Sequence, residues 1–137
     1  MKQLSFLILA IGLSLASYAQ PIQIMNSAAC TVQVTLLTSP PGATCSGFIP
    51  SHQTYVVPPG GSVSVPDPAP NYWFSAQVIF SNAPGSFCGP TVTVSKGCTG
   101  GCNLGSPPTA SASAAACGSC GPNLSVDWAT CNTLFIF

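Results

Sequence analysis

Hydrophobic and polar residues alternate along several short runs of this chain, and such alternation predicts half-buried β-strands. In the cleanest run, 31–36, Val32, Val34 and Leu36 fall on one face and polar side chains on the other. Proline- and glycine-rich breaks separate the runs, as is typical of turns between strands. We therefore expect about eight short strands, at residues 22–26, 31–36, 53–57, 62–65, 72–81, 91–94, 125–128 and 133–137.

The run 72–81 is the strongest of these strands, and it is apolar on both faces. Alternation turns Trp73 and Ile79 away from the core, so we expect either a loop or a partner to cover that face. The side chains that would face the core are Tyr72, Phe74, Ala76, Val78 and Phe80.

Short strands with Gly/Pro turns at regular spacing predict an all-β fold. We expect a disulfide-stapled antiparallel two-sheet sandwich of immunoglobulin-like architecture. Two neighbouring runs, 53–57 and 62–65, flank a Pro-Pro-Gly-Gly break and should form a hairpin. Residues 109–116 are rich enough in alanine for a turn or two of helix, although serines and flanking glycines weaken that prediction.

The N-terminal residues 1–19 have the features of a signal peptide, with Lys2 near the start, an apolar run and a small-x-small motif ending at Ala19. The apolar run is too short to span a bilayer of about 30 Å, and we expect no membrane insertion. The brief leader is typical of a bacterial host. Its removal would leave residues 20–137 as a single secreted domain.

The chain has eight cysteines, all of them after the leader, and an even number in an exported chain predicts up to four disulfides. Sequence alone does not choose among the possible pairings. Five of them crowd into a Gly-, Ser- and Ala-rich stretch and its flank, so we expect residues 98–123 to form a long excursion held by disulfides. The eight are Cys30, Cys45, Cys88, Cys98, Cys102, Cys117, Cys120 and Cys131.

Two other interpretations of the cysteine cluster compete with the disulfides. The spacing of Cys98 and Cys102 from Cys117 and Cys120 is similar to that of a zinc ribbon, in which four thiolates hold the metal. Alternatively, Cys117 and Cys120 could form a redox-active pair, which would need a cation or a helix N-terminus nearby. Export to an oxidising compartment favours structural disulfides over both.

Charge is almost absent: after the leader, only Asp67, Lys96 and Asp127 carry charged side chains, and the single histidine is His52. Nucleic-acid binding requires clustered Lys and Arg, so no nucleic-acid partner is expected. A hydrolase would need His52 to meet an aspartate and a marked nucleophile, and no such motif is present. We predict no enzymatic activity, no catalytic residue, no cofactor and no metal site.

The absence of repulsive charge predicts self-association, and hence a structural protein of an extracellular filament, coat or matrix, or an adhesive component. The alternative is a monomeric module that binds a carbohydrate or a surface protein through exposed aromatic rings. The C-terminal strand 133–137 could be internal to the sandwich or pair with a neighbouring subunit. The candidate binding or assembly surface comprises Trp73, Ile79, Trp128, Leu134, Phe135, Ile136 and Phe137.

Overall fold

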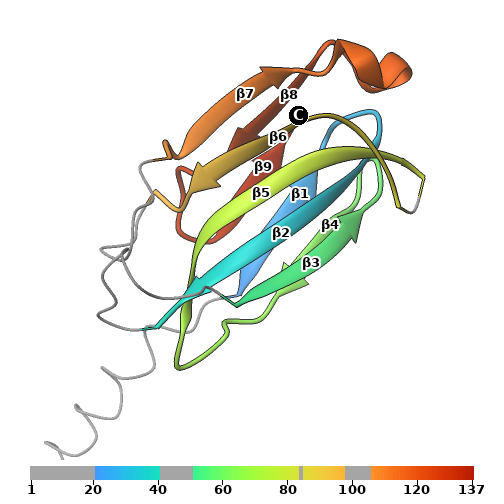
Figure 1. Cartoon of the computed structure of the whole chain (residues 1–137). Coiled ribbons are helices and arrows are strands. Elements are labelled where there is room, and N and C mark those ends of the chain that lie inside the picture. The colour runs from blue at the N-terminus through green and yellow to red at the C-terminus, as the bar shows by residue number, and fades with distance from the viewer. Residues whose placement is uncertain (1–20, 41–50, 84, 98–105) are drawn as a thin grey trace, which may run out of the picture.

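The computed structural model describes residues 21–40, 51–83, 85–97 and 106–137, which build two packed β-sheets (Figure 1). The predicted all-β sandwich is confirmed, with nine strands where about eight were expected. The signal-peptide prediction for residues 1–19 lies outside the described residues, as do Cys45, Cys98 and Cys102.

Each sheet draws its strands from distant parts of the sequence. The five-stranded sheet has the order β4 (Ser62–Val65), β1 (Ile22–Asn26), β9 (Thr133–Ile136), β8 (Asn123–Asp127), β7 (Thr109–Ser113). The four-stranded sheet has the order β3 (His52–Val57), β2 (Thr31–Ser39), β5 (Tyr72–Ala83), β6 (Ser86–Ser95). All pairs are antiparallel except β1 with β9, which run parallel.

The core lies between the sheets and follows the alternation in the sequence. In β1 the buried and exposed residues alternate strictly, so that Ile22 and Ile24 face inward and Gln23 and Met25 face outward. Each fully buried aliphatic or aromatic side chain contributes about 1.5–3 kcal/mol through removal of apolar surface from water. The largest fully buried side chains are Trp73, Trp128, Phe74, Phe80, Ile22, Ile24, Leu36, Leu124, Leu134 and Ile136.

The prediction that β3 and β4 form a hairpin is wrong. β3 pairs with β2 in one sheet, and β4 pairs with β1 in the other. The Pro-Pro-Gly-Gly connection therefore passes from sheet to sheet, with a turn closed by Gly61 N donating to Pro58 O at 3.0 Å. Both Val57 and Val65, on either side of this connection, are buried, so crossing between the sheets places both in one core.

The excursion 98–123 contains a strand that the sequence pattern did not predict. Residues Thr109–Ser113 form β7, and a 3₁₀ segment, η1, follows at Ala115–Cys120. Ala110 and Ala112 pack against the core while Ser111 and Ser113 are exposed, which is strand alternation with small side chains. Pairing with β8 outweighs the helix propensity of alanine here.

The C-terminal strand β9 is internal, between β1 and β8. This confirms the internal alternative for that strand. Backbone bonds continue the pairing past the strand end, because Ser125 N donates to Phe137 O at 2.8 Å and Phe137 N donates to Ser125 O at 3.0 Å.

The two sides of the sandwich differ. On one side, β6 and β7 approach each other, and Ser95 N donates to Pro107 O at 3.0 Å. Gly97 lies so close to the β8–β9 connection that a Cβ there would be 2.8 Å from Ala129 O. On the opposite side, β3 and β4 are the last strands of their sheets (Figure 1). In the described part of the sandwich, contacts therefore bridge the two sheets along the β6–β7 side, and β3 and β4 end the sheets along the other side.

Candidate functional site

Four residues of the predicted surface belong to the core instead. Trp128, Leu134 and Ile136 are fully buried and Trp73 is 2% exposed, so none of them can contact a partner. The expected outward orientation of Trp73 is wrong, because the register of β5 with β2 shifts beside Leu37 and Thr38 and Trp73 packs in the core cluster. Its indole Nε1 donates to Pro66 O at 3.1 Å in the β4–β5 connection. Both tryptophans therefore stabilise the fold, and the prediction that they form a binding surface is wrong.

The remaining predicted surface residues are accessible. Phe135 is 38% exposed, Phe137 is 58% exposed, and Ile79 is partly exposed on the outer face of β5. The β1–β9 register sets Met25, which is 39% exposed, opposite Phe135. Met25, Phe135 and Phe137 together form what we call the apolar strip, on the outer face of the five-stranded sheet. The alternation in the sequence predicts that Met25 faces outward, as Gln23 does. Only the β1–β9 register shows that Met25 lies beside Phe135.

A shallow groove of about 250 Å³ runs beside the apolar strip. Its floor is the β7–β8 pair, in which Ser111 lies opposite Ser125 and Thr109 opposite Asp127. Phe137 forms one wall. The groove thus combines an aromatic ring, three hydroxyls and one carboxylate, and none of its lining residues is cationic.

The carboxylate of Asp127 is partly used by its own chain, because Oδ1 accepts a hydrogen bond from Ala129 N at 2.8 Å. This turn residue ends β8 in the five-stranded sheet, whereas His52 begins β3 in the four-stranded sheet. The structure therefore places Asp127 and His52 in different sheets and does not combine them in one catalytic site.

Asp67 and Lys96 lie near enough to interact. Burial raises the pKa of the Asp67 carboxyl above its usual range, and the positive charge of Lys96 partly opposes this shift. Burial lowers the pKa of the Lys96 ammonium, and the charge of Asp67 partly opposes that shift. These opposite charges offset each other, which leaves Asp127 as the remaining charged side chain of the part that the structure describes.

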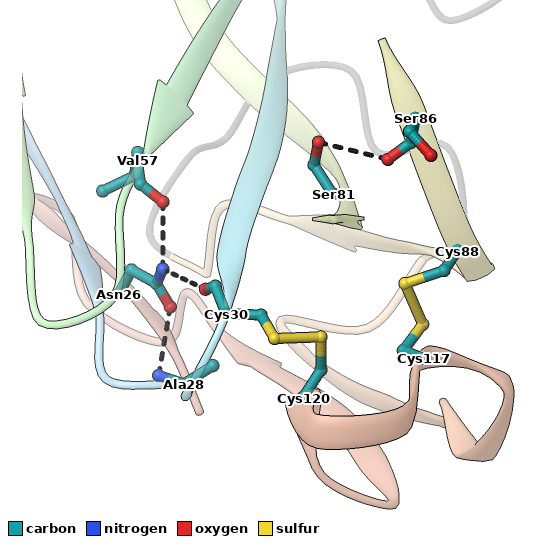
Figure 2. Close-up of a disulfide and its surroundings, with 9 residues drawn as sticks. All are labelled: Asn26, Ala28, Cys30, Val57, Ser81, Ser86, Cys88, Cys117 and Cys120. Carbon is teal, nitrogen blue, oxygen red and sulfur yellow. Dashed lines mark hydrogen bonds between the residues drawn. A yellow bond between two sulfur atoms is a disulfide. The ribbon is translucent and has the colours of Figure 1, made fainter. Parts of the chain in front are cut away.

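Two disulfides fasten the η1 segment to the four-stranded sheet (Figure 2). Cys120 bonds Cys30 at the start of β2, and Cys117 bonds Cys88 in β6, with Cα–Cα distances of 4.9 and 5.2 Å. Cys131 is also disulfide-bonded, and no described cysteine is free. Disulfides of this kind indicate an oxidising, extracellular compartment.

These pairings decide between the alternatives for the cysteine cluster. Cys117 bonds a cysteine in β6, and Cys120 bonds the cysteine directly before β2, so in this structure neither sulfur is a thiolate ligand and the two do not form a redox pair. Cys98 and Cys102 lie outside the described residues. The segment around Cys117 is therefore structural, as the disulfide interpretation predicted.

An open hollow of about 570 Å³ lies at this disulfide end. It is lined by uncharged residues, chiefly Cys30, Thr31, Pro59, Ser81, Ala116 and Cys117. Nearby, Ser81 Oγ donates to Ser86 O at 3.3 Å and so is engaged within its own hairpin (Figure 2). The lining offers no acid or base, and its shape follows from the way η1 is fastened.

Within the described ranges, no helix has the length and apolar character needed to cross a membrane. No protein-family model, no curated protein and no solved structure matches this chain.

Proposed function

We propose that this protein is a secreted structural component of an extracellular assembly, such as a filament, coat, matrix or adhesive layer, and that it self-associates. The observation that carries the proposal is the nearly uncharged surface. Asp67 and Lys96 offset each other, so two copies meet without the long-range repulsion that keeps most proteins apart.

The apolar strip supports the same function. Met25, Phe135 and Phe137 are each more than a third exposed, and they follow two adjacent strands in the middle of the sheet. Burial of such side chains against a second copy would remove apolar area from water at about 25 cal/mol per Å². The disulfides would make the folded unit resistant to unfolding outside the cell.

The test is the assembly state of the protein purified from its producing cells with disulfides intact. We expect the weight-average mass in sedimentation experiments to rise with concentration, and electron microscopy to show regular polymers. A mass that stays at one chain up to millimolar concentration would contradict the proposal. Salt provides a control, because an assembly without ion pairs should not dissociate when ionic strength is raised.

A second candidate function, binding of a neutral carbohydrate, is favoured by the groove beside Phe137. Sugar rings have apolar faces that pack on aromatic rings and hydroxyl rims that exchange hydrogen bonds. Phe137 supplies the first kind of contact, while Ser111, Ser125 and Asp127 supply the second.

Glycan binding by the monomer distinguishes this candidate from assembly. We expect neutral oligosaccharides to shift the amide NMR signals of Ser111 and Ser125, and Phe137→Ala to remove those shifts. Ser64→Ala, on the distant edge strand β4, is the matched control. A glycan screen without a single reproducible hit would eliminate this candidate.

A further inference from the structure

We propose that two copies of this chain pair through the edge strand β3, antiparallel and around a two-fold axis at Thr54. The inference rests on the proposed self-assembly and names the surface that would carry it. In the described residues, β3 is the last strand of the four-stranded sheet and pairs only with β2.

The hydrogen-bond phase of β3 identifies the backbone groups that face the open edge. Thr38 N donates to Ser51 O at 2.9 Å, directly after the pair Leu37–His52, so Thr38 and Ser51 are a hydrogen-bonded pair. Such pairs alternate along an antiparallel ladder. The N–H and C=O groups that point to β2 are therefore those of Gln53, Tyr55 and Val57. Those that point to the open edge belong to His52, Thr54 and Val56.

These three residues are exposed, and Val56 is 58% exposed. Natural edge strands are usually protected by a lysine, a proline, a bulge or a covering segment. The sequence of β3, HQTYVV, contains neither lysine nor proline, and its register with β2 has no shift. By contrast, β4 on the same side is only four residues long. Of the two edges on this side, β3 therefore offers the longer and less protected template.

A second copy is the occupant that the edge fits best, because the open positions are symmetric about Thr54. In the antiparallel dimer, Thr54 would face its own copy, and His52 would face Val56 of the second copy. Each of these pairs exchanges two backbone hydrogen bonds, about six in all. No pair sets two permanently charged side chains against each other, since β3 contains no Asp, Glu, Lys or Arg.

Two separate contact surfaces would allow the assembly to grow beyond a dimer. The β3 edge belongs to the four-stranded sheet, and the apolar strip belongs to the outer face of the other sheet. A chain that uses one two-fold contact at each surface has neighbours on two sides. Alternation of two such contacts extends a row of copies and does not stop at a dimer.

Thr54→Pro tests the edge directly in the full disulfide-bonded protein. Proline removes an N–H that points outward, so the ladder with β2 stays intact, and edge strands accept proline at such positions. The contact at the two-fold axis loses both central hydrogen bonds. We expect the dissociation constant for the β3 contact to rise about tenfold or more. The melting temperature should stay within a few degrees of the wild-type value.

The matched control is Gln77→Lys, an exposed change on the same sheet face but in the central strand β5, and it should leave association unchanged. If Thr54→Pro does not fold, Val56→Lys tests the β3 contact instead, because it places a lysine at the strand edge and leaves the backbone hydrogen-bonding groups unchanged. Association of either folded variant at the wild-type constant would overturn the β3 inference and leave the proposed function standing. A wild-type protein that stays monomeric would overturn both.

Discussion

The buried side chain of Asn26 in β1 donates a hydrogen bond from Nδ2 to the backbone carbonyl of Val57 in β3, at 3.0 Å, and so joins the two sheets (Figure 2). The same amide nitrogen lies 2.8 Å from Cys30 O and 3.0 Å from Pro58 O, and Oδ1 accepts from Ala28 N at 3.0 Å. One side chain thus satisfies backbone groups from three segments at the end where β2 begins and β3 ends.

Replacement of Asn26 by alanine should therefore destabilise the fold. A buried backbone group left without its partner costs about 1–3 kcal/mol, and Asn26→Ala leaves several. We expect the free energy of unfolding to fall by about 2–4 kcal/mol in denaturant titrations. Asn123→Ala, an exposed asparagine in β8, is the control and should change it by less than about 0.5 kcal/mol. Equal effects of the two substitutions would contradict the role assigned to Asn26.

The two disulfides should differ in how much they stabilise the fold. Cys30–Cys120 closes a loop with a sequence separation of 90, and Cys88–Cys117 one of 29. In the chain-entropy description the longer loop restricts the unfolded state more, by about 1 kcal/mol. We expect the double variant Cys30→Ser/Cys120→Ser to unfold at lower denaturant concentration than Cys88→Ser/Cys117→Ser. The reverse order would show that native-state packing, and not loop closure, dominates at these bridges.

Much of the fold could be predicted from the sequence because alternation encodes burial directly. The run 22–26 predicts β1 with its bounds, and Ala76, Val78 and Phe80 face the core as expected. The register shift at the start of β5 breaks the predicted alternation, so that Phe74 is buried outside the core cluster and Tyr72 is only partly buried. The strand β7 was missed because Thr-Ala-Ser-Ala-Ser contains no large apolar residue, so its alternation has little hydrophobic contrast. Its order comes from pairing with β8 and from the nearby disulfides, which are tertiary effects.

Pairing across space was beyond the sequence pattern. The link between β3 and β4 has the residues of a tight hairpin, and only the positions of Val57 and Val65 in a common core show that it joins two sheets. The same holds for the candidate surface. The register of β5 with β2 shifts beside Leu37 and Thr38, so that Trp73 packs in the core cluster instead of facing outward. Met25, in contrast, gains importance only through its partner Phe135.

Asp67 should stabilise the folded protein more as pH falls, whereas carboxyl groups in ordinary acid denaturation stabilise it less. Burial raises the pKa of this carboxyl in the folded state. Because the folded-state pKa is raised, the folded protein binds this proton more tightly than the unfolded chain does. Protonation of Asp67 therefore contributes fully to stability below the unfolded pKa of about 3.9, and this contribution is lost as pH rises through the folded-state pKa. We expect the melting temperature of the wild type, relative to Asp67→Asn, to rise on acidification through this window. A relative fall would contradict the assigned burial of Asp67.

The apolar strip yields a matched pair of substitutions. Phe135 is 38% exposed on the outer face of the five-stranded sheet, and Phe87 is 48% exposed on β6 in the other sheet. Phe135→Ser removes the central ring of the strip and should weaken association about tenfold or more, since about 60 Å² of lost apolar contact is worth roughly 1.5 kcal/mol. Phe87→Ser removes a comparable exposed ring outside the strip and should leave the sedimentation profile unchanged. Equal losses from both would mean that exposed rings in general drive association, and no change from either would remove the strip from the assembly surface.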